Sequence, residues 1–214
     1  TTEVTTTITL FKDSFGRADN TTEIDAVLDG ITDNTGSSLT AGNVYERPFS
    51  GNATASQIVS NELSLATGSG SSNGYIDHNF TNSDILSNGG FKVSVDVTDI
   101  GGTGTGQGAS FSVGMSSARA DTGGDALNGD SKFQDGLADG GNASNDVSIA
   151  DFWVMLRGNG SLVWGGLGNS ITGTDESGLL GSVDVGSKTG QISAEFTMQS
   201  FDAGATVAYE VFFN

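Results

Sequence analysis

The residues with the clearest capacity for chemistry are aspartates and an asparagine in a glycine-rich segment of the chain. They are Asp121, Asp125, Asn128, Asp130 and Asp135. Ca²⁺ takes about six to eight oxygen ligands from Asp, Asn, backbone carbonyls and water, and glycine turns let short side chains converge. The pattern predicts a Ca²⁺ site that orders the segment, although its spacing departs from the EF-hand pattern. The alternative is a solvated acidic surface that keeps the chain soluble.

Aromatic residues form a second candidate site. Trp153 and Trp164 lie on the two strands predicted on either side of Gly158-Asn159-Gly160, and Tyr75 lies in a weaker strand. Aromatic rings on an exposed face, with polar groups that fix orientation, form binding sites for ligands such as sugars. These three residues therefore predict a carbohydrate-binding face, assisted by Ca²⁺. The alternative is that both tryptophans pack inside the fold.

The chain lacks the groups that nucleophilic or acid–base catalysis needs. It has no cysteine, and its one histidine, His78, alternates with apolar Ile76 and Phe80. A retaining glycosidase holds two carboxyl groups about 5 Å apart, which acidic residues at alternate positions of one strand supply. Here Glu23 and Asp25 are followed by Val27, so the third acidic position is missing. The sequence predicts no catalytic residues and a protein that is not an enzyme.

Composition excludes several classes of protein. Of 214 residues 33 are Gly and 1 is Pro, and the formal net charge is −18. That charge repels phosphate backbones, which excludes nucleic acid as a partner, and no apolar run is long enough to span a membrane. The length suits one undivided β domain. A start at Thr1, together with the composition, leads us to expect a secreted protein that is extracellular or on the cell surface.

Alternation of apolar and polar residues predicts the elements that must position these side chains. It is strongest over 91–98, 109–115, 191–198 and 206–213, while 152–157 is apolar on both faces and forms a hairpin with the strand after Gly160. Weaker strands are expected over 3–11, 43–49, 58–66 and 74–80. Helix is limited to about two turns near 22–28. The pattern predicts an all-β fold with very little helix, an antiparallel two-sheet β-sandwich of the jelly-roll type.

Three stretches resemble a known family. Residues 13–21, Asp-Ser-Phe-Gly-Arg-Ala-Asp-Asn-Thr, resemble the opening motif of concanavalin A-like (laminin G-like) jelly-roll domains in bacterial secreted and surface proteins. Residues 61–65 and 90–96 resemble two strands of that family. The resemblance implies a concanavalin A-like fold over roughly residues 10 to 214. Its motifs describe strands and turns, so it implies little about chemistry.

The N-terminal segment 1–11 precedes this motif and has a strand pattern of its own. Val4, Thr6, Ile8 and Leu10 fall on one face, so we expect an N-terminal strand extension over 1–11 and a single sandwich domain over 12–214. The strand completes either the sheet of its own chain or that of a neighbouring copy. The second arrangement predicts a non-catalytic structural subunit of a surface assembly or filament, with copies of the chain as partners. The alternative function is a Ca²⁺-assisted adhesion module that binds extracellular glycans.

Overall fold

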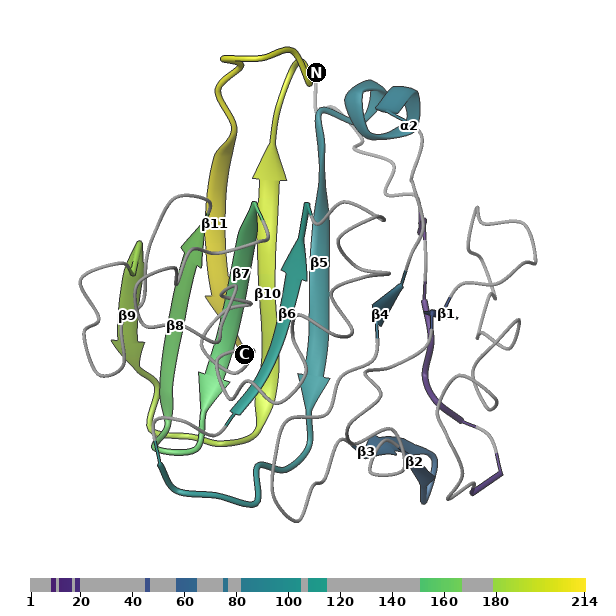
Figure 1. Cartoon of the computed structure of the whole chain (residues 1–214), viewed down its shortest axis with the longest axis vertical. Helices are drawn as coiled ribbons and strands as arrows, with labels where there is room; N and C mark the ends of the chain where they lie inside the picture. Colours follow the sequence, from purple (N-terminus) through teal and green to yellow (C-terminus); the bar gives the residue numbers. More distant parts are fainter. Residues whose placement is uncertain are drawn as a thin grey trace, which may run out of the picture. The chain divides into compact units, whose positions relative to one another are not determined.

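A computed structural model gives the fold of the chain (Figure 1). It describes residues 9–10, 12–16, 18–19, 45–46, 57–64, 75–76, 82–104, 108–114, 151–166 and 179–214. Within these residues eleven strands accompany one short helix, and all strand pairs are antiparallel. The elements, in chain order, are β1 (Tyr45–Glu46), β2 (Gln57–Val59), β3 (Glu62–Ser64), β4 (Tyr75–Ile76), α2 (Asn82–Ser87), β5 (Gly90–Val97), β6 (Gly108–Val113), β7 (Phe152–Arg157), β8 (Ser161–Gly166), β9 (Gly181–Asp184), β10 (Gly190–Thr197) and β11 (Ala208–Phe213).

The chain divides into two compact units. The first joins residues 1–68 and 72–89, and the second joins 69–71 and 90–214. In the first unit β1 pairs with β4 and β2 pairs with β3. The second unit contains all the longer strands. No helix in the described part of the chain has the length and apolar character that a membrane-spanning helix needs.

Two antiparallel sheets make up the second unit. A three-stranded sheet has the order β11-β10-β5, and a four-stranded sheet has the order β6-β7-β8-β9 (Figure 1). In β10 the residues Ile192, Ala194 and Phe196 are buried, as strict alternation of apolar residues predicts for the side that meets another sheet. This arrangement confirms the predicted all-β antiparallel sandwich. The jelly-roll connectivity and the single domain over 12–214 stay predictions.

Aromatic rings connect the two sheets. Phe152 at the start of β7 contacts Phe196 of β10 edge-on, with ring centroids 5.1 Å apart. The same ring lies 4.8 Å from the ring of Tyr209 on β11, and Phe196 in turn stacks on Phe91 of β5 at 4.8 Å. Since Phe152 contacts both β10 and β11, β7 lies across the boundary between these two strands.

The six strongest predicted strands are confirmed as β5, β6, β7, β8, β10 and β11, but one predicted strand needs correction and two elements have no counterpart among the predictions. The strand expected over 58–66 is a hairpin, because Ser60 and Asn61 both have positive φ (55° and 64°) and turn the chain between β2 and β3. The strand β9 was not predicted, since Val183 is its one large apolar residue. The helix α2 was not predicted either, and it ends where Gly89 takes a φ of 73°.

Candidate functional site

The predicted calcium ligands and the segments considered for catalysis lie outside the described residues. This holds for Asp121, Asp125, Asn128, Asp130 and Asp135, and also for Glu23, Asp25 and His78. Within the described ranges, no three His, Asp or Glu side chains come close enough to hold a metal ion. The calcium site therefore stays a prediction.

Three of the acidic residues that the structure describes, Asp13, Asp19 and Asp184, hold turns. Asp13 Oδ1 accepts a hydrogen bond from the backbone N–H of Phe15 at 2.8 Å, and Asp184 Oδ1 accepts one from Gly186 at 2.9 Å. Asp19 Oδ1 accepts the N–H of Ser60 at 2.7 Å and so fastens the tight β2–β3 turn. Asp13 and Asp19 both belong to the motif at 13–21, so two of its acidic residues stabilise backbone turns.

The two tryptophans lie on neighbouring strands but on opposite faces of the four-stranded sheet. Trp153 shares the face of Met155 and Val163, on the side away from Phe152, and is fully buried. Each indole covers the glycine that faces it across the strand pair, Trp153 over Gly165 and Trp164 over Gly181, because a Cβ added at either glycine would overlap the ring. Glycine opposite an aromatic residue is a recurrent way to pack a sheet surface.

Of the three predicted sugar-binding residues, Trp153 has no exposed ring face, and the carbohydrate-binding face as a whole stays a prediction. Stacking on a sugar needs an exposed ring face, and the Trp153 ring is fully buried while Trp164 is half-buried. Neither indole N–H has a hydrogen-bond partner among the described residues. The backbone of Tyr75 lies in β4, and its side chain is outside the described part of the chain.

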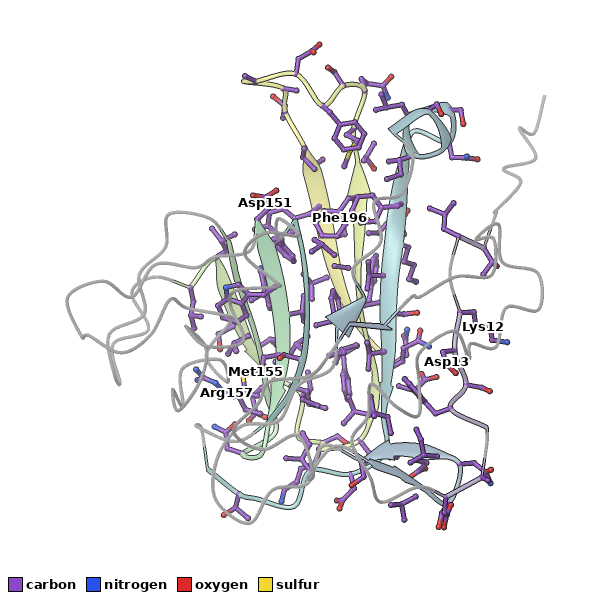
Figure 2. The ribbon with its side chains drawn as sticks, turned by 45° about the vertical axis from the view of Figure 1, so that its right-hand side comes forward. Lys12, Asp13, Asp151, Met155, Arg157 and Phe196 are labelled. Atoms are coloured by element: carbon purple, nitrogen blue, oxygen red, sulfur yellow. The ribbon has the colours of Figure 1, made fainter. Side chains whose placement is uncertain are left out.

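Two charged groups mark the ends of β7 (Figure 2). Arg157 closes the strand and is only 4 % exposed. Asp151 lies just before the strand, against Gly114, and burial among these neighbours raises the pKa of its carboxyl group. Much of the Asp151 side chain still reaches solvent. The two groups are at opposite ends of a six-residue strand, too far apart for a joint proton transfer.

The backbone edge of β11 is the described feature with the clearest capacity to bind another chain. Gln191 and Asn214 exchange both of their backbone hydrogen bonds, with N–O distances of 2.8 and 3.1 Å. Hydrogen-bonded and non-hydrogen-bonded pairs alternate in an antiparallel ladder. It follows from the register that Tyr209, Val211 and Phe213 point their N–H and C=O groups away from β10.

The side chains of these residues face the other sheet, yet they are incompletely covered. Tyr209 is 39 % exposed and Val207, which continues the alternation before β11, is 44 % exposed. Across from them on the four-stranded sheet, Leu180 and Val183 are 47 % and 46 % exposed. We call the outward backbone groups of Tyr209, Val211 and Phe213, with the side chains of these residues and Val207, the β11 edge. No described strand pairs with it.

No family model, curated protein or solved structure matches this chain. The resemblance to concanavalin A-like domains therefore stays a prediction, and the site rests on the geometry of the chain itself. Sequence analysis placed the alternating residues of β11 in a strand but gave no sign that this strand lies at an edge. Strand order depends on which segments pair across the sheet, and alternation within one strand does not encode it.

Of the predicted assembly strand, the structure describes only Thr9 and Leu10. Thr9 forms an isolated β-bridge and Leu10 is half-buried. Val4, Thr6 and Ile8 lie outside the described residues. The segment is therefore in contact with its own chain at residue 9, and the partner of residues 1–8 stays a prediction.

Proposed function

We propose that this chain is a non-catalytic structural subunit, secreted and extracellular, that assembles with copies of itself by addition of its N-terminal strand. The observation that carries the proposal is the apolar surface left exposed along the strands of an otherwise well-packed sandwich. Val95, Val183, Val207, Tyr209 and Phe212 are each more than a third exposed. Exposed apolar strands and unpaired backbone edges are the features through which sheets add further strands.

Physical constraints on such an assembly follow from the charge. At a net charge of −18, whole molecules repel one another at low ionic strength. A joining segment with few charges avoids this repulsion, and between Val4 and Phe11 the N-terminal segment has none. Assembly is therefore expected to increase with salt, as screening weakens the repulsion between subunits.

The same proposal includes a bound Ca²⁺ ion that stabilises the acidic segment 121–135. A bound Ca²⁺ would offset the repulsion among clustered carboxylates. Glycan binding is the weaker candidate, because the full burial of Trp153 removes one of the aromatic faces on which it depended.

The test is the size of the purified chain in solution, by light scattering and negative-stain imaging. We expect ordered multimers in the full-length chain and their loss when residues 1–8 are deleted or when Ile8→Asp places a charge on the apolar face. Thr2→Asp adds the same charge before Val4, the first apolar residue of that face, and should leave the multimers intact. A monodisperse monomer at every salt and Ca²⁺ concentration would contradict the proposal.

A further inference from the structure

The two edges of the three-stranded sheet differ in chemistry. The backbone groups of Ile192, Ala194 and Phe196 in β10 form hydrogen bonds with the residues opposite them in β5. The alternate residues of β5, Lys92, Ser94 and Asp96, therefore point their backbone N–H and C=O groups away from β10, toward the open edge. These side chains are polar or charged and exposed, a combination that discourages strand pairing. At the β11 edge, the outward groups belong to Tyr209, Val211 and Phe213. The inward-facing side chains are apolar at both edges, so the edges differ on the opposite face, where β5 presents the charged Lys92 and Asp96 and β11 presents Glu210 with the apolar Phe212.

Among the described residues, the offset between the sheets leaves the position beside β11 without a strand. Neighbouring strands of a sheet lie about 4.8 Å apart. Because β7 lies over the boundary between β10 and β11, β8 lies roughly half a strand spacing beyond β11, and β9 lies roughly one and a half spacings beyond it. Figure 1 shows β8 and β9 to the left of β11. The exposed Leu180 and Val183, with the half-buried Trp164, lie on this extension. One further strand paired with β11 would cover them.

The same offset excludes antiparallel pairing of β11 with β11 of a second copy about a twofold axis. In that arrangement the two three-stranded sheets become one, and both four-stranded sheets lie on the same side of it. Each copy's β8 would then coincide with the other copy's β8, and each β9 with the other copy's β7, because β8 and β9 extend past their own β11. A single strand fits beside β11, whereas a whole sandwich does not.

The N-terminal segment of a second copy has the properties that this position requires. Residues 3–8, Glu-Val-Thr-Thr-Thr-Ile, match β11 in length, with six residues each. Val4, Thr6 and Ile8 alternate with Thr5 and Thr7, which are uncharged and so can lie beside Glu210 without repulsion. Thr9 and Leu10 already contact their own chain, so the segment is anchored at its C-terminal end.

We propose that residues 3–8 of one copy pair with the β11 edge of the next copy, with Thr6 opposite Val211 and with Val4 and Ile8 facing Trp164, Leu180 and Val183. This inference rests on the proposed function and adds the receiving strand to it. It makes the contact heterologous, because donor and acceptor are different surfaces. Repetition of the contact gives an open chain of subunits.

Two matched proline variants test the receiving edge. Val211→Pro removes an outward N–H of β11 without removing a hydrogen bond to β10, and Ser94→Pro does the same at the β5 edge. We expect multimers to be lost in Val211→Pro and kept in Ser94→Pro, with circular dichroism showing that both sandwiches are folded. Loss in Ser94→Pro alone would overturn the inference. Multimers that survive Val211→Pro but need residues 1–8 would also overturn it and leave the proposed function standing.

Engineered cysteines give an answer that does not depend on the fold of the proline variants. The natural chain has no cysteine, so thiols occur only where they are introduced. Mixing Thr6→Cys chains with Val211→Cys chains should give a disulfide-linked dimer under mild oxidation, at least about tenfold more than Thr6→Cys with Ser94→Cys. A chain with both Thr6→Cys and Val211→Cys is the further control. If it forms the disulfide only within one chain, and the mixture of single variants gives no dimer, the strand completes its own sheet and the inference is overturned.

Discussion

Two strands of the sandwich, β7 and β11, are buried to very different extents. Every residue of the central strand β7 is buried. In β11, by contrast, four of six residues are exposed and the other two are half-buried. Both strands are rich in apolar residues, so composition does not explain the difference. Position in the sheet does, because β7 has a neighbour on each side and β11 has a described neighbour only at β10.

The outer face of the four-stranded sheet adds to this contrast. Trp153, Met155 and Val163 form a buried cluster there, and Leu179 packs against it. This sheet therefore has apolar contacts on both faces. The corresponding face of the three-stranded sheet has Phe212, which is 36 % exposed beside the ammonium group of Lys92, 5.4 Å from its ring centroid. The outer face of the four-stranded sheet is therefore better covered than that of the three-stranded sheet at Phe212, whereas exposed apolar side chains occur at the edges of both sheets.

The largest effect is expected from removing an aromatic ring on the outer face of each sheet. Trp153→Ala should lower the free energy of unfolding by about 3–5 kcal/mol, because the ring is fully buried and leaves a cavity. Phe212→Ala should cost only about 1 kcal/mol, since its ring is partly in water. Urea titration measures both. Equal losses would contradict the idea that the two sheets contribute differently.

An intermediate effect is expected from filling the space that Trp164 occupies over Gly181. In Gly181→Ala the new methyl group overlaps the ring, so the indole must move or the strands must separate, at a cost of about 1–3 kcal/mol. Gly101→Ala is the matched control, because no heavy atom lies within 4 Å of its Cβ position. Thermal unfolding and tryptophan fluorescence should change in the first variant only. A Gly181→Ala chain as stable as the control would show that this face of the sheet is loosely packed.

The smallest effect is expected from the charge at the end of β7. Burial raises the pKa of Asp151 above its ordinary value of 3.8, so the folded chain holds this proton more tightly than the unfolded chain. The group's contribution to stability is therefore present in acid and lost as the pH rises through its folded pKa. Asp151→Asn should be slightly more stable than the natural chain near pH 7. That advantage should shrink toward pH 3 in thermal melts, and an advantage that grew in acid would contradict the assignment.

Sequence analysis predicted local structure well where alternation was regular. The residues of β5 and β10 alternate strictly and pair in register, and the turn at Gly158-Asn159-Gly160 joins β7 to β8, with the N–H of Gly160 donating to Arg157 at 2.9 Å. Prediction failed for β9, where small residues give no alternation. It also gave no means to decide between exposed and packed tryptophans, since both faces of β7 are apolar.

The antiparallel strands, the positions of the strongest of them and the side chains that share a face all follow from the order of residues, because these properties depend on neighbours along the chain. The burial of Trp153, the turns held by Asp13 and Asp19 and the edge position of β11 are known only from the fold. These properties depend on contacts between residues distant in sequence. Strand order and the offset of one sheet over the other set those contacts, and local alternation is compatible with many orders.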